Sequence, residues 1–332
     1  TWRGQKYMNT SKMRKWKKRA GIVIVVIVFG MVIAAYARTY FCYAQKYQKH
    51  KRVFGATYMT MNNQFYKVIN NEIKLQVEEN GDHLIALDPA LDSEKQNEQI
   101  KYLVKKKVDV IFLNPVDWKK VKPGLEAAKK AGIPVIVIDT PVYDEDLVDM
   151  TIVSDNYQAG VQCAQDMMKK RKGANIVLLT HKTTKSGEDR IQGFLDTIEG
   201  HDGYRIIDSA DTEGQIERSL PKVEDIVEKH DDIDVIMALN DPAAMGALAA
   251  LDSKNYNRDV LVYGVDGSPE AKKLIEEGLM TGTSAQFPKQ MADTAIEAAY
   301  QLMEGKAIPK TKEISVEMIT KTNISQFDIN RW

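Results

Sequence analysis

The sequence predicts an α/β protein with two doubly wound parallel-sheet lobes, preceded by one N-terminal transmembrane or signal helix. Three observations support this fold. Uninterrupted runs of Val and Ile indicate strands that are buried on both faces, as in parallel sheets covered by helices. These runs alternate with amphipathic stretches from Val53 onward. The runs are also numerous for one sheet of this type, so two lobes are the more economical arrangement.

An uncharged apolar run at residues 20–37 follows a cluster of Lys and Arg within residues 1–19. About 18 apolar residues is the lower limit for a helix that spans a membrane. Basic residues on the amino side predict that residues 1–19 are cytoplasmic and that the rest of the chain is extracytoplasmic. Two interpretations stay open, a retained signal anchor and a signal peptide cleaved near Ala37. We expect the polar and aromatic residues 38–51 to form a short stalk.

The remaining elements follow in a regular order. Strands are expected at 53–58, 83–87, 110–113, 135–138, 150–153, 175–179, 204–209, 235–239, 260–265 and 281–285. Helices are expected at 65–80, 94–106, 119–131, 157–170, 188–199, 215–230, 242–252, 269–277 and 288–304. Asp241-Pro242 and Ser268-Pro269 each place a capping residue before a proline in the first turn, which marks two of the helix starts.

Composition excludes several classes of function. Of the 332 residues, 44% are hydrophobic and 28% are charged, which is typical of a globular protein. The net charge is zero, so no nucleic-acid partner is expected. Cys42 and Cys163 are the only cysteines, which excludes a disulfide framework and a cysteine-rich metal site. The five histidines lack metal-ligand spacing, and we expect neither a metal nor a cofactor.

Small polar residues follow four of the apolar runs. They are Asn62-Asn63, Asp139, Asn240 and Asp266. In open α/β sheets, ligands bind just beyond the carboxyl ends of the strands. Amides and carboxylates placed there can donate and accept hydrogen bonds in pairs, as vicinal hydroxyl groups require. The pattern therefore predicts a converging site for a sugar or a polyol.

Eight short motifs add a more specific signal. They lie at residues 60–66, 113–117, 133–139, 153–156, 189–194, 238–241, 264–269 and 285–288. In order and spacing, across roughly residues 52–320, they resemble the periplasmic sugar-binding proteins of the ribose-binding type, the solute receptors of ABC importers. The resemblance implies two lobes joined by a hinge of three crossings, near Ser154, Gln286 and Val316. It assigns 52–154 plus 287–316 to an N-terminal lobe and 155–286 plus 317–332 to a C-terminal lobe.

The resemblance also implies a set of ligand-binding residues. They are Asn63, Phe65, Tyr66, Asp139, Arg190, Asn240, Asp266 and, at a hinge crossing, Gln286. Arg190 can donate several hydrogen bonds to ring oxygens, and Asp266 can balance its charge. Phe65 is expected to offer a face to the apolar side of a sugar ring. The plainer alternatives are that the strand-end aspartates cap helices, that Arg190 is solvated, and that Phe65 and Tyr66 are core residues.

Two positions depart from the pattern of the ribose binders. Thr140 stands where those proteins often carry arginine, and Thr212 stands where a stacking aromatic is expected. These smaller side chains are expected to leave more room on the second-lobe side of the site. The sequence therefore predicts a ligand other than ribose, such as a hexose or a cyclic polyol.

The leading hypothesis is an extracytoplasmic, monomeric receptor that captures a monosaccharide or polyol by hinge closure and delivers it to an ABC permease. A second hypothesis is a membrane-anchored sugar sensor that signals to a histidine kinase or chemoreceptor. An enzyme is disfavoured, because residues 264–267 lack the dinucleotide-binding spacing and no nucleophilic triad is apparent. A repressor of the same fold needs an N-terminal helix-turn-helix, where this chain has an apolar run.

Overall fold

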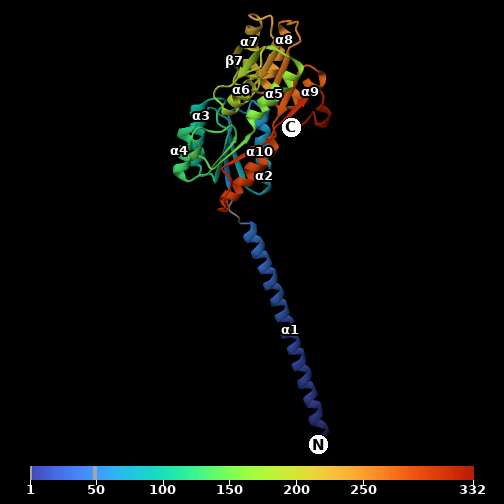
Figure 1. The fold of residues 1–332 in the computed structure, drawn as a ribbon. Helices are drawn as coiled ribbons and strands as arrows, with labels where there is room; N and C mark the ends of the chain where they lie inside the picture. Colours follow the sequence, from blue (N-terminus) through green and yellow to red (C-terminus); the bar gives the residue numbers. More distant parts are fainter. Residues whose placement is uncertain (1, 48–50) are drawn as a thin grey trace. The chain divides into compact units, whose positions relative to one another are not determined.

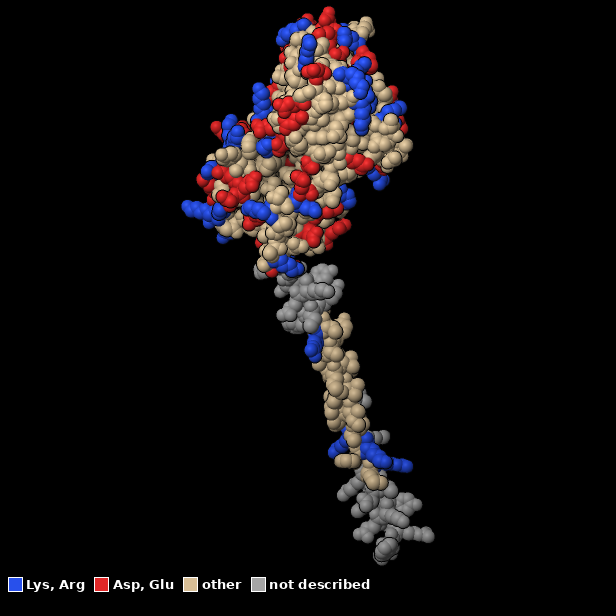
Figure 2. Space-filling model, in the orientation of Figure 1, with Lys and Arg blue, Asp and Glu red and all other residues tan. Residues whose placement is uncertain are grey.

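The computed structural model describes residues 2–47 and 51–332, and the chain divides into two units, Thr1–Lys51 and Arg52–Trp332. In the first unit, helix α1 (Trp2–Tyr47) includes Met13–Tyr40, a stretch of 28 residues that contains an 18-residue window with a mean hydropathy of 2.7. This stretch is long and apolar enough to cross a membrane, and it fits a signal sequence as well as an anchor. Figure 2 shows an uncharged segment in this stretch, with Lys and Arg on both sides of it. Residues 38–47, expected as a stalk, continue the helix.

Within the described part of Arg52–Trp332, the strands form two six-stranded sheets, one in each lobe (Figure 1). The sheet of the first lobe has the order β11-β5-β4-β3-β1-β2, with β1 (Val53–Thr57), β2 (His83–Leu87), β3 (Val110–Leu113), β4 (Val135–Asp139), β5 (Met150–Ser154) and β11 (Thr311–Ile314). The sheet of the second lobe has the order β12-β10-β9-β8-β6-β7, with β6 (Ala174–Thr180), β7 (Tyr204–Asp211), β8 (Val235–Ala238), β9 (Leu261–Asp266), β10 (Gly282–Ala285) and β12 (Glu317–Thr320). Their strands are parallel, except that β12 pairs antiparallel with β10.

Helices connect the parallel strands and cover both faces of each sheet. Those that pack on the first lobe are α2 (Gln64–Glu79), α3 (Ser93–Lys105), α4 (Lys122–Ala131) and α10 (Pro288–Met303). Those of the second lobe are α5 (Asn156–Lys170), α6 (Lys185–Ile198), α7 (Ile216–Val227), α8 (Asp241–Ser253) and α9 (Pro269–Glu277). Short 3-10 helices lie at Glu145–Leu147 and Ile324–Gln326. The prediction of two doubly wound lobes is confirmed.

Strand β4 shows why the Val and Ile runs predicted such sheets. Ile136 and Ile138 pack into one core of the first lobe, whereas Val135 and Val137 pack into the core on the other face. Successive side chains of a strand point to opposite faces, so a strand covered on both sides must be apolar at every position.

The chain passes between the two sheets three times in the described residues. It leaves the first sheet after β5, returns after β10 to form α10, and passes from β11 directly to β12. Helix α10 packs against α2 of the first lobe. These passages form the three-crossing hinge that the resemblance implied, and they place Gln286 between the lobes.

Several expected elements differ from the observed ones. Strands β11 and β12 were not predicted, because they are short edge strands whose exposed, charged residues lack an apolar run. Helix α4 starts at Lys122 instead of residue 119, since the carboxylate of Asp117 accepts the backbone N–H groups of Lys119 and Lys120 and forms a turn. Helix α6 starts three residues earlier than expected, with Thr184 as its cap.

Candidate functional site

All eight residues implied by the resemblance line one cavity between the lobes, which we call the inner cavity. They are Asn63, Phe65, Tyr66, Asp139, Arg190, Asn240, Asp266 and Gln286. The other lining residues are Met59, His181, Thr184, Ser186, Glu213, Gln215 and Leu239. The volume of the inner cavity is about 20 Å³, room for about one water molecule. A monosaccharide therefore enters only when the lobes separate or the lining side chains move.

Arg190 is 4% exposed and lies on the inner side of α6. Its Nε donates a hydrogen bond to Oδ1 of Asn156 at 2.8 Å. Its Nη1 donates to the carbonyl oxygen of Leu239 at 3.0 Å and lies 3.8 Å from Oδ1 of Asp266. The alternative that Arg190 is a solvated helix residue is therefore wrong. A buried guanidinium with two fixed partners is oriented before any ligand arrives.

The close packing of α5 against α6 brings Asn156 to Arg190. A Cβ atom at Gly160 in α5 would lie 1.8 Å from the carbonyl oxygen of Arg190, so only glycine allows this approach. Any larger residue at position 160 would push the helices apart and separate the guanidinium from the Asn156 side chain.

The two strand-end aspartates share an unusual backbone conformation. Asp139 ends β4 with a φ of 78°, and Asp266 ends β9 with a φ of 140°. Such angles favour glycine, and each costs an aspartate roughly 1–3 kcal/mol. Strain of this kind concentrates at ligand sites, where the surrounding structure holds a side chain in one direction. The matched positions give each lobe one carboxylate at the cavity.

Neither aspartate caps a helix, so that alternative is wrong. The N-cap of α9 is Ser268, whose Oγ accepts the backbone N–H of Ala271 at 3.1 Å. The carboxylate of Asp139 accepts hydrogen bonds from Tyr66 Oη at 3.3 Å and from Asn114 Nδ2 at 3.1 Å. These donors come from α2 and from the end of β3, the strand next to β4.

Burial decides the electrostatics of these carboxyl groups. It raises the pKa of Asp139, an effect that the Arg190 guanidinium partly opposes. Burial raises the pKa of Asp266 well above its usual range, and the neighbouring Asp241 carboxyl raises it further, while Arg190 and Gln286 lower it. A ligand that donates hydrogen bonds to these oxygens would stabilise their charged forms, as the hydroxyl groups of a sugar do.

Asn63 and Asn240 do act as helix caps while they line the cavity. Oδ1 of Asn63 accepts the backbone N–H of Phe65 at 2.9 Å, at the start of α2. Oδ1 of Asn240 accepts the backbone N–H of Ala243 at 3.0 Å, and its Nδ2 donates to the carbonyl oxygen of Gly214 at 3.1 Å. Gly214 has a φ of 64°, and a Cβ there would lie 2.7 Å from that Nδ2. Both asparagines are thus fixed by local structure.

Phe65 and Tyr66 are buried in the core of the first lobe and also line the inner cavity. They are therefore both core residues and residues of the candidate site. Their rings pack edge to face with centroids 5.6 Å apart. This contact fixes the orientation of both rings.

Gln286 occupies the second crossing between the lobes. Its Nε2 donates to Oδ1 of Asp266 at 2.8 Å, and its backbone N–H donates to the carbonyl oxygen of Asp266 at 3.0 Å. Its Oε1 is buried and has no hydrogen-bond partner among the residues that the structure describes. An unpaired buried acceptor costs about 1–3 kcal/mol, which a hydroxyl donor from a ligand would recover.

Sequence reasoning missed several lining residues that obey the rule it used for the others. His181 follows the end of β6, and Glu213 and Gln215 follow the end of β7. His181 was expected to be structural or on the surface, but it is 5% exposed and lines the inner cavity. Burial lowers the pKa of His181 to about 4, so its imidazole is neutral at pH 7. All three residues would have been found if the rule about strand ends had been applied to β6 and to the more polar β7 as well.

Asp241 does not line the inner cavity but holds residues next to Asp266 in place. Its carboxylate accepts hydrogen bonds from the Ser268 backbone N–H at 2.8 Å and from Thr283 Oγ1 at 2.6 Å. Burial raises the pKa of Asp241 to about 6. The positive charge of the Arg190 guanidinium partly offsets the effect of burial on the carboxyl groups of both Asp241 and Asp266.

Thr140 and Thr212 do not line the inner cavity. Thr140 Oγ1 accepts the backbone N–H of Ser186 at 3.1 Å, a contact between the lobes. Thr212 Oγ1 donates to the carbonyl oxygen of Thr180 at 3.4 Å. Glu213 and Gln215, which follow Thr212 in the chain, line the inner cavity instead.

Further hydrogen bonds join the two lobes around the cavity. The backbone N–H of Trp118 donates to the carbonyl oxygen of Thr183 at 3.1 Å, and Thr183 Oγ1 donates to the carbonyl oxygen of Val116 at 3.2 Å. Asn62 Nδ2 donates to Glu217 Oε1 at 3.2 Å. These contacts are few and peripheral, so they hold the lobes together while leaving a hinge free to open them.

Comparison with known proteins agrees with this architecture. The ribose import binding protein of Bacillus subtilis is 28% identical over 275 residues, which cover 82% of this chain and 88% of that protein. A D-apiose import binding protein of Paraburkholderia graminis is 26% identical over 274 residues, covering 81% of this chain and 87% of that protein.

Solved structures show the same fold. An ABC transporter solute-binding protein of Mycobacterium smegmatis with bound glycerol superposes with a TM-score of 0.79 at 27% identity, covering 83% of this chain and 96% of that one. The myo-inositol-binding protein of Caulobacter has a TM-score of 0.79 at 23% identity, covering 84% and 96%. The profile of the periplasmic binding protein domain family matches residues 54–307. The chain therefore belongs to the periplasmic binding protein family, whose members are extracytoplasmic solute receptors.

Proposed function

We propose that this protein is an extracytoplasmic receptor that captures a sugar or cyclic polyol between its lobes and delivers it to an ABC importer. The convergence at the inner cavity carries this proposal: Asp139 comes from one lobe, Arg190 and Asp266 come from the other, and Gln286 comes from the hinge. Such a site is assembled only when both lobes meet. Closure around a bound ring would therefore be coupled to binding.

The chemistry of the cavity suits a ring with several hydroxyl groups. Asp139 and Asp266 accept hydrogen bonds from hydroxyls, Arg190 donates to ring or hydroxyl oxygens, and Gln286 Oε1 is an acceptor that lacks a partner in the described structure. Phe65 adds an apolar edge beside these polar groups. The sugars and polyols named for the relatives are consistent with this class of ligand, and no catalytic step is proposed.

Helix α1 gives the proposed location. Retained, it would tether the receptor to the outer face of the membrane; removed near Ala37, it would act as a signal peptide. We favour the tether, because the uncharged apolar run at residues 20–37 has 18 residues, more than the 7–15 apolar residues of a signal peptide.

A thermal-shift screen tests the function. The full chain, in a detergent without a sugar headgroup, is heated with pentoses, hexoses and inositols. A ligand at 100 times its Kd stabilises the folded state by about 2.7 kcal/mol, so at least one compound should raise the Tm by several degrees. No shift with any sugar or polyol would contradict the proposal.

A retained anchor would also favour a second function, a membrane-anchored sensor of the same ligand that signals to a histidine kinase or chemoreceptor. Uptake of the radiolabelled ligand by cells that lack the protein separates the two. Lost uptake identifies an importer receptor, whereas normal uptake with a lost transcriptional or tactic response identifies a sensor.

A further inference from the structure

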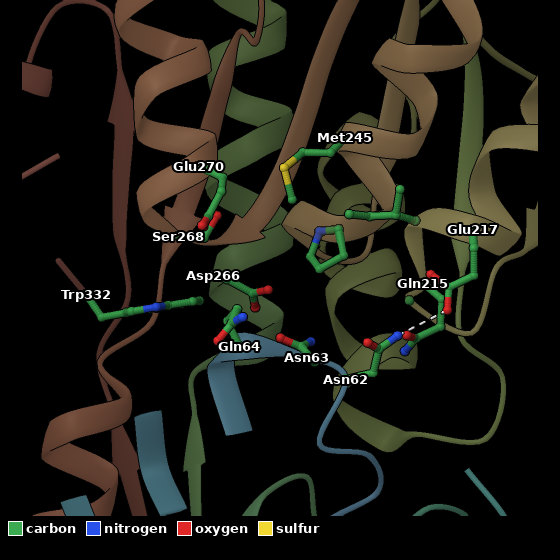
Figure 3. A pocket seen from close by; sticks show the side chains of 13 residues that line it. Asn62, Asn63, Gln64, Gln215, Glu217, Met245, Asp266, Ser268, Glu270 and Trp332 are labelled. Atoms are coloured by element: carbon green, nitrogen blue, oxygen red, sulfur yellow. Dashed lines mark hydrogen bonds between the residues drawn. The ribbon is translucent and has the colours of Figure 1, made fainter. Parts of the chain in front are cut away.

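A second cavity, which we call the outer cavity, adjoins the inner one. This outer cavity has a volume of about 290 Å³ and shares three wall residues with the inner cavity, Asn63, Gln215 and Asp266. In the view of Figure 3, Trp332 and Asn62 lie at opposite ends of the outer cavity, with Asp266 and Asn63 between them. The cleft therefore has a small polar inner part and a much larger outer part.

The walls of the outer cavity are amphipathic. Pro242 and Met245 of α8 and the indole of Trp332 form apolar surface. Gln64 and Glu270 place an amide and a carboxylate in the same wall. Sugar rings present apolar C–H faces and polar edges, so an aromatic face bordered by hydrogen-bonding groups suits them.

Trp332 belongs to a segment that links the two lobes. Lys272 of α9 donates a hydrogen bond to the carbonyl oxygen of Asp328 at 2.6 Å and another to that of Arg331. The Trp332 ring then packs edge to face on Phe65 of the first lobe, with ring centroids 5.3 Å apart. A buried lysine of one lobe thus holds the backbone just before Trp332, and an aromatic residue of the other lobe packs against its indole.

We propose that the ligand of this receptor has two rings: a sugar unit in the inner cavity and a second ring in the outer cavity, stacked on Trp332. The proposal rests on the proposed sugar-receptor function and deepens it. The inner cavity, once opened, has the groups to fix one polar ring, while the outer cavity has the volume and the aromatic face for another. Trp332 would then determine specificity for a disaccharide or glycoside over its single-ring component.

Calorimetry on the full chain, in a detergent without a sugar headgroup, tests this proposal. The probes are matched pairs: galactose with lactose, glucose with cellobiose and with maltose, and xylose with xylobiose. We expect at least one two-ring probe to bind tenfold or more tightly than its single-ring partner. Trp332→Ala should weaken that probe at least tenfold and change the single-ring partner less than twofold.

Two further variants isolate the aromatic face. Trp332→Phe should recover part of the affinity for the two-ring probe, because it keeps a ring on Phe65. Tyr102→Ala removes an exposed aromatic residue on α3 and should change neither affinity. If single rings bind as tightly as the two-ring probes, or Trp332→Ala weakens both equally, this inference is overturned while the receptor function stands. If no two-ring probe binds while a single-ring sugar or polyol raises the Tm in the thermal-shift screen, this inference is overturned and the receptor function stands. If no compound binds in either experiment, both are overturned.

Discussion

Nη1 of Arg190 lies 3.8 Å from Oδ1 of Asp266, and both side chains are buried between the lobes, at 4% and 5% exposure. At that separation the two charges attract without a direct hydrogen bond. The guanidinium is held by Asn156 and Leu239, and the carboxylate is held by Gln286. The pair is therefore spaced so that a ligand oxygen can hydrogen-bond to both partners at once.

Removing either member of this pair should weaken ligand binding. Arg190→Ala and Asp266→Ala each leave buried polar groups unpaired, at a cost of roughly 1–3 kcal/mol, so the affinity should fall about 10- to 100-fold. Calorimetry measures the affinity, and circular dichroism checks that each variant is folded.

Matched controls come from exposed ion pairs. Arg258→Ala breaks the pair with Asp234 ahead of β8, and Asp259→Ala breaks the pair with Arg171; both should leave the affinity unchanged. Equal affinity of the wild type and both cavity variants would remove Arg190 and Asp266 from the site.

We expect the protein to prefer a ligand other than ribose. Thr140 and Thr212 leave the inner cavity without the cation and the aromatic face that the resemblance implies at these two positions. A pocket that bonds particular hydroxyl groups discriminates strongly against an analogue that lacks them. Competitive titration with ribose, glucose, galactose, xylose and inositols measures this preference. Submicromolar binding of ribose, with the others much weaker, would show that the two threonines do not redirect specificity.

Stability should depend on pH through His181. Burial is the main cause of its lowered pKa of about 4; the Asp211 carboxylate raises this pKa and the Arg190 guanidinium lowers it further. In the unfolded chain the imidazole has a pKa of about 6.5, so it binds a proton below that pH while the folded form stays neutral. The stability that His181 contributes is present above pH 6.5 and is lost as the pH falls towards 4.

Urea unfolding at pH 7 and pH 5 measures this effect. The wild type should lose about 2 kcal/mol more than His181→Gln between these values. Asp241, with a raised pKa of about 6, has the opposite slope because its stabilisation declines as the pH rises from 4 to 6. Comparing the wild type with His181→Gln cancels that slope. A variant whose stability follows the wild type at both values would contradict the lowered pKa.

The basic cluster ahead of residues 20–37 predicts the orientation of the chain in the membrane. Protease added to intact cells or spheroplasts should digest residues 52–332 from outside. Immunoblotting of the domain before and after lysis gives the result. Protection of the domain until the membrane is opened would place it in the cytoplasm and contradict the extracytoplasmic assignment.

Much of the fold was predictable because buried parallel strands must be apolar on both faces, as β4 and β8 are. Strands β11 and β12 were not predictable in this way, since each lies at a sheet edge with exposed charged residues. Edge strands are defined by their neighbours in space, which a local pattern does not contain.

The site divides along similar lines. Asp139 and Asp266 were found because each ends an apolar run, and the structure places both at the cavity. His181 was missed although it follows the apolar strand β6, because the histidines were considered only as metal ligands. Gln215 was missed because strand β7, which precedes it, is largely polar. Trp332 was missed for another reason: its position depends on Lys272 and Phe65, which lie far away in the sequence. Contacts of that range follow from the tertiary fold alone.

A crystal structure of residues 52–332 with the tightest ligand from the screen would show whether a sugar or polyol binds between the lobes. These residues contain both sheets and their cores. We predict a ring within hydrogen-bond distance of Arg190 and Asp266, with one hydroxyl donating to Oε1 of Gln286. A ligand bound outside the cleft, or one in the cleft with no contact to these three side chains, would contradict the account.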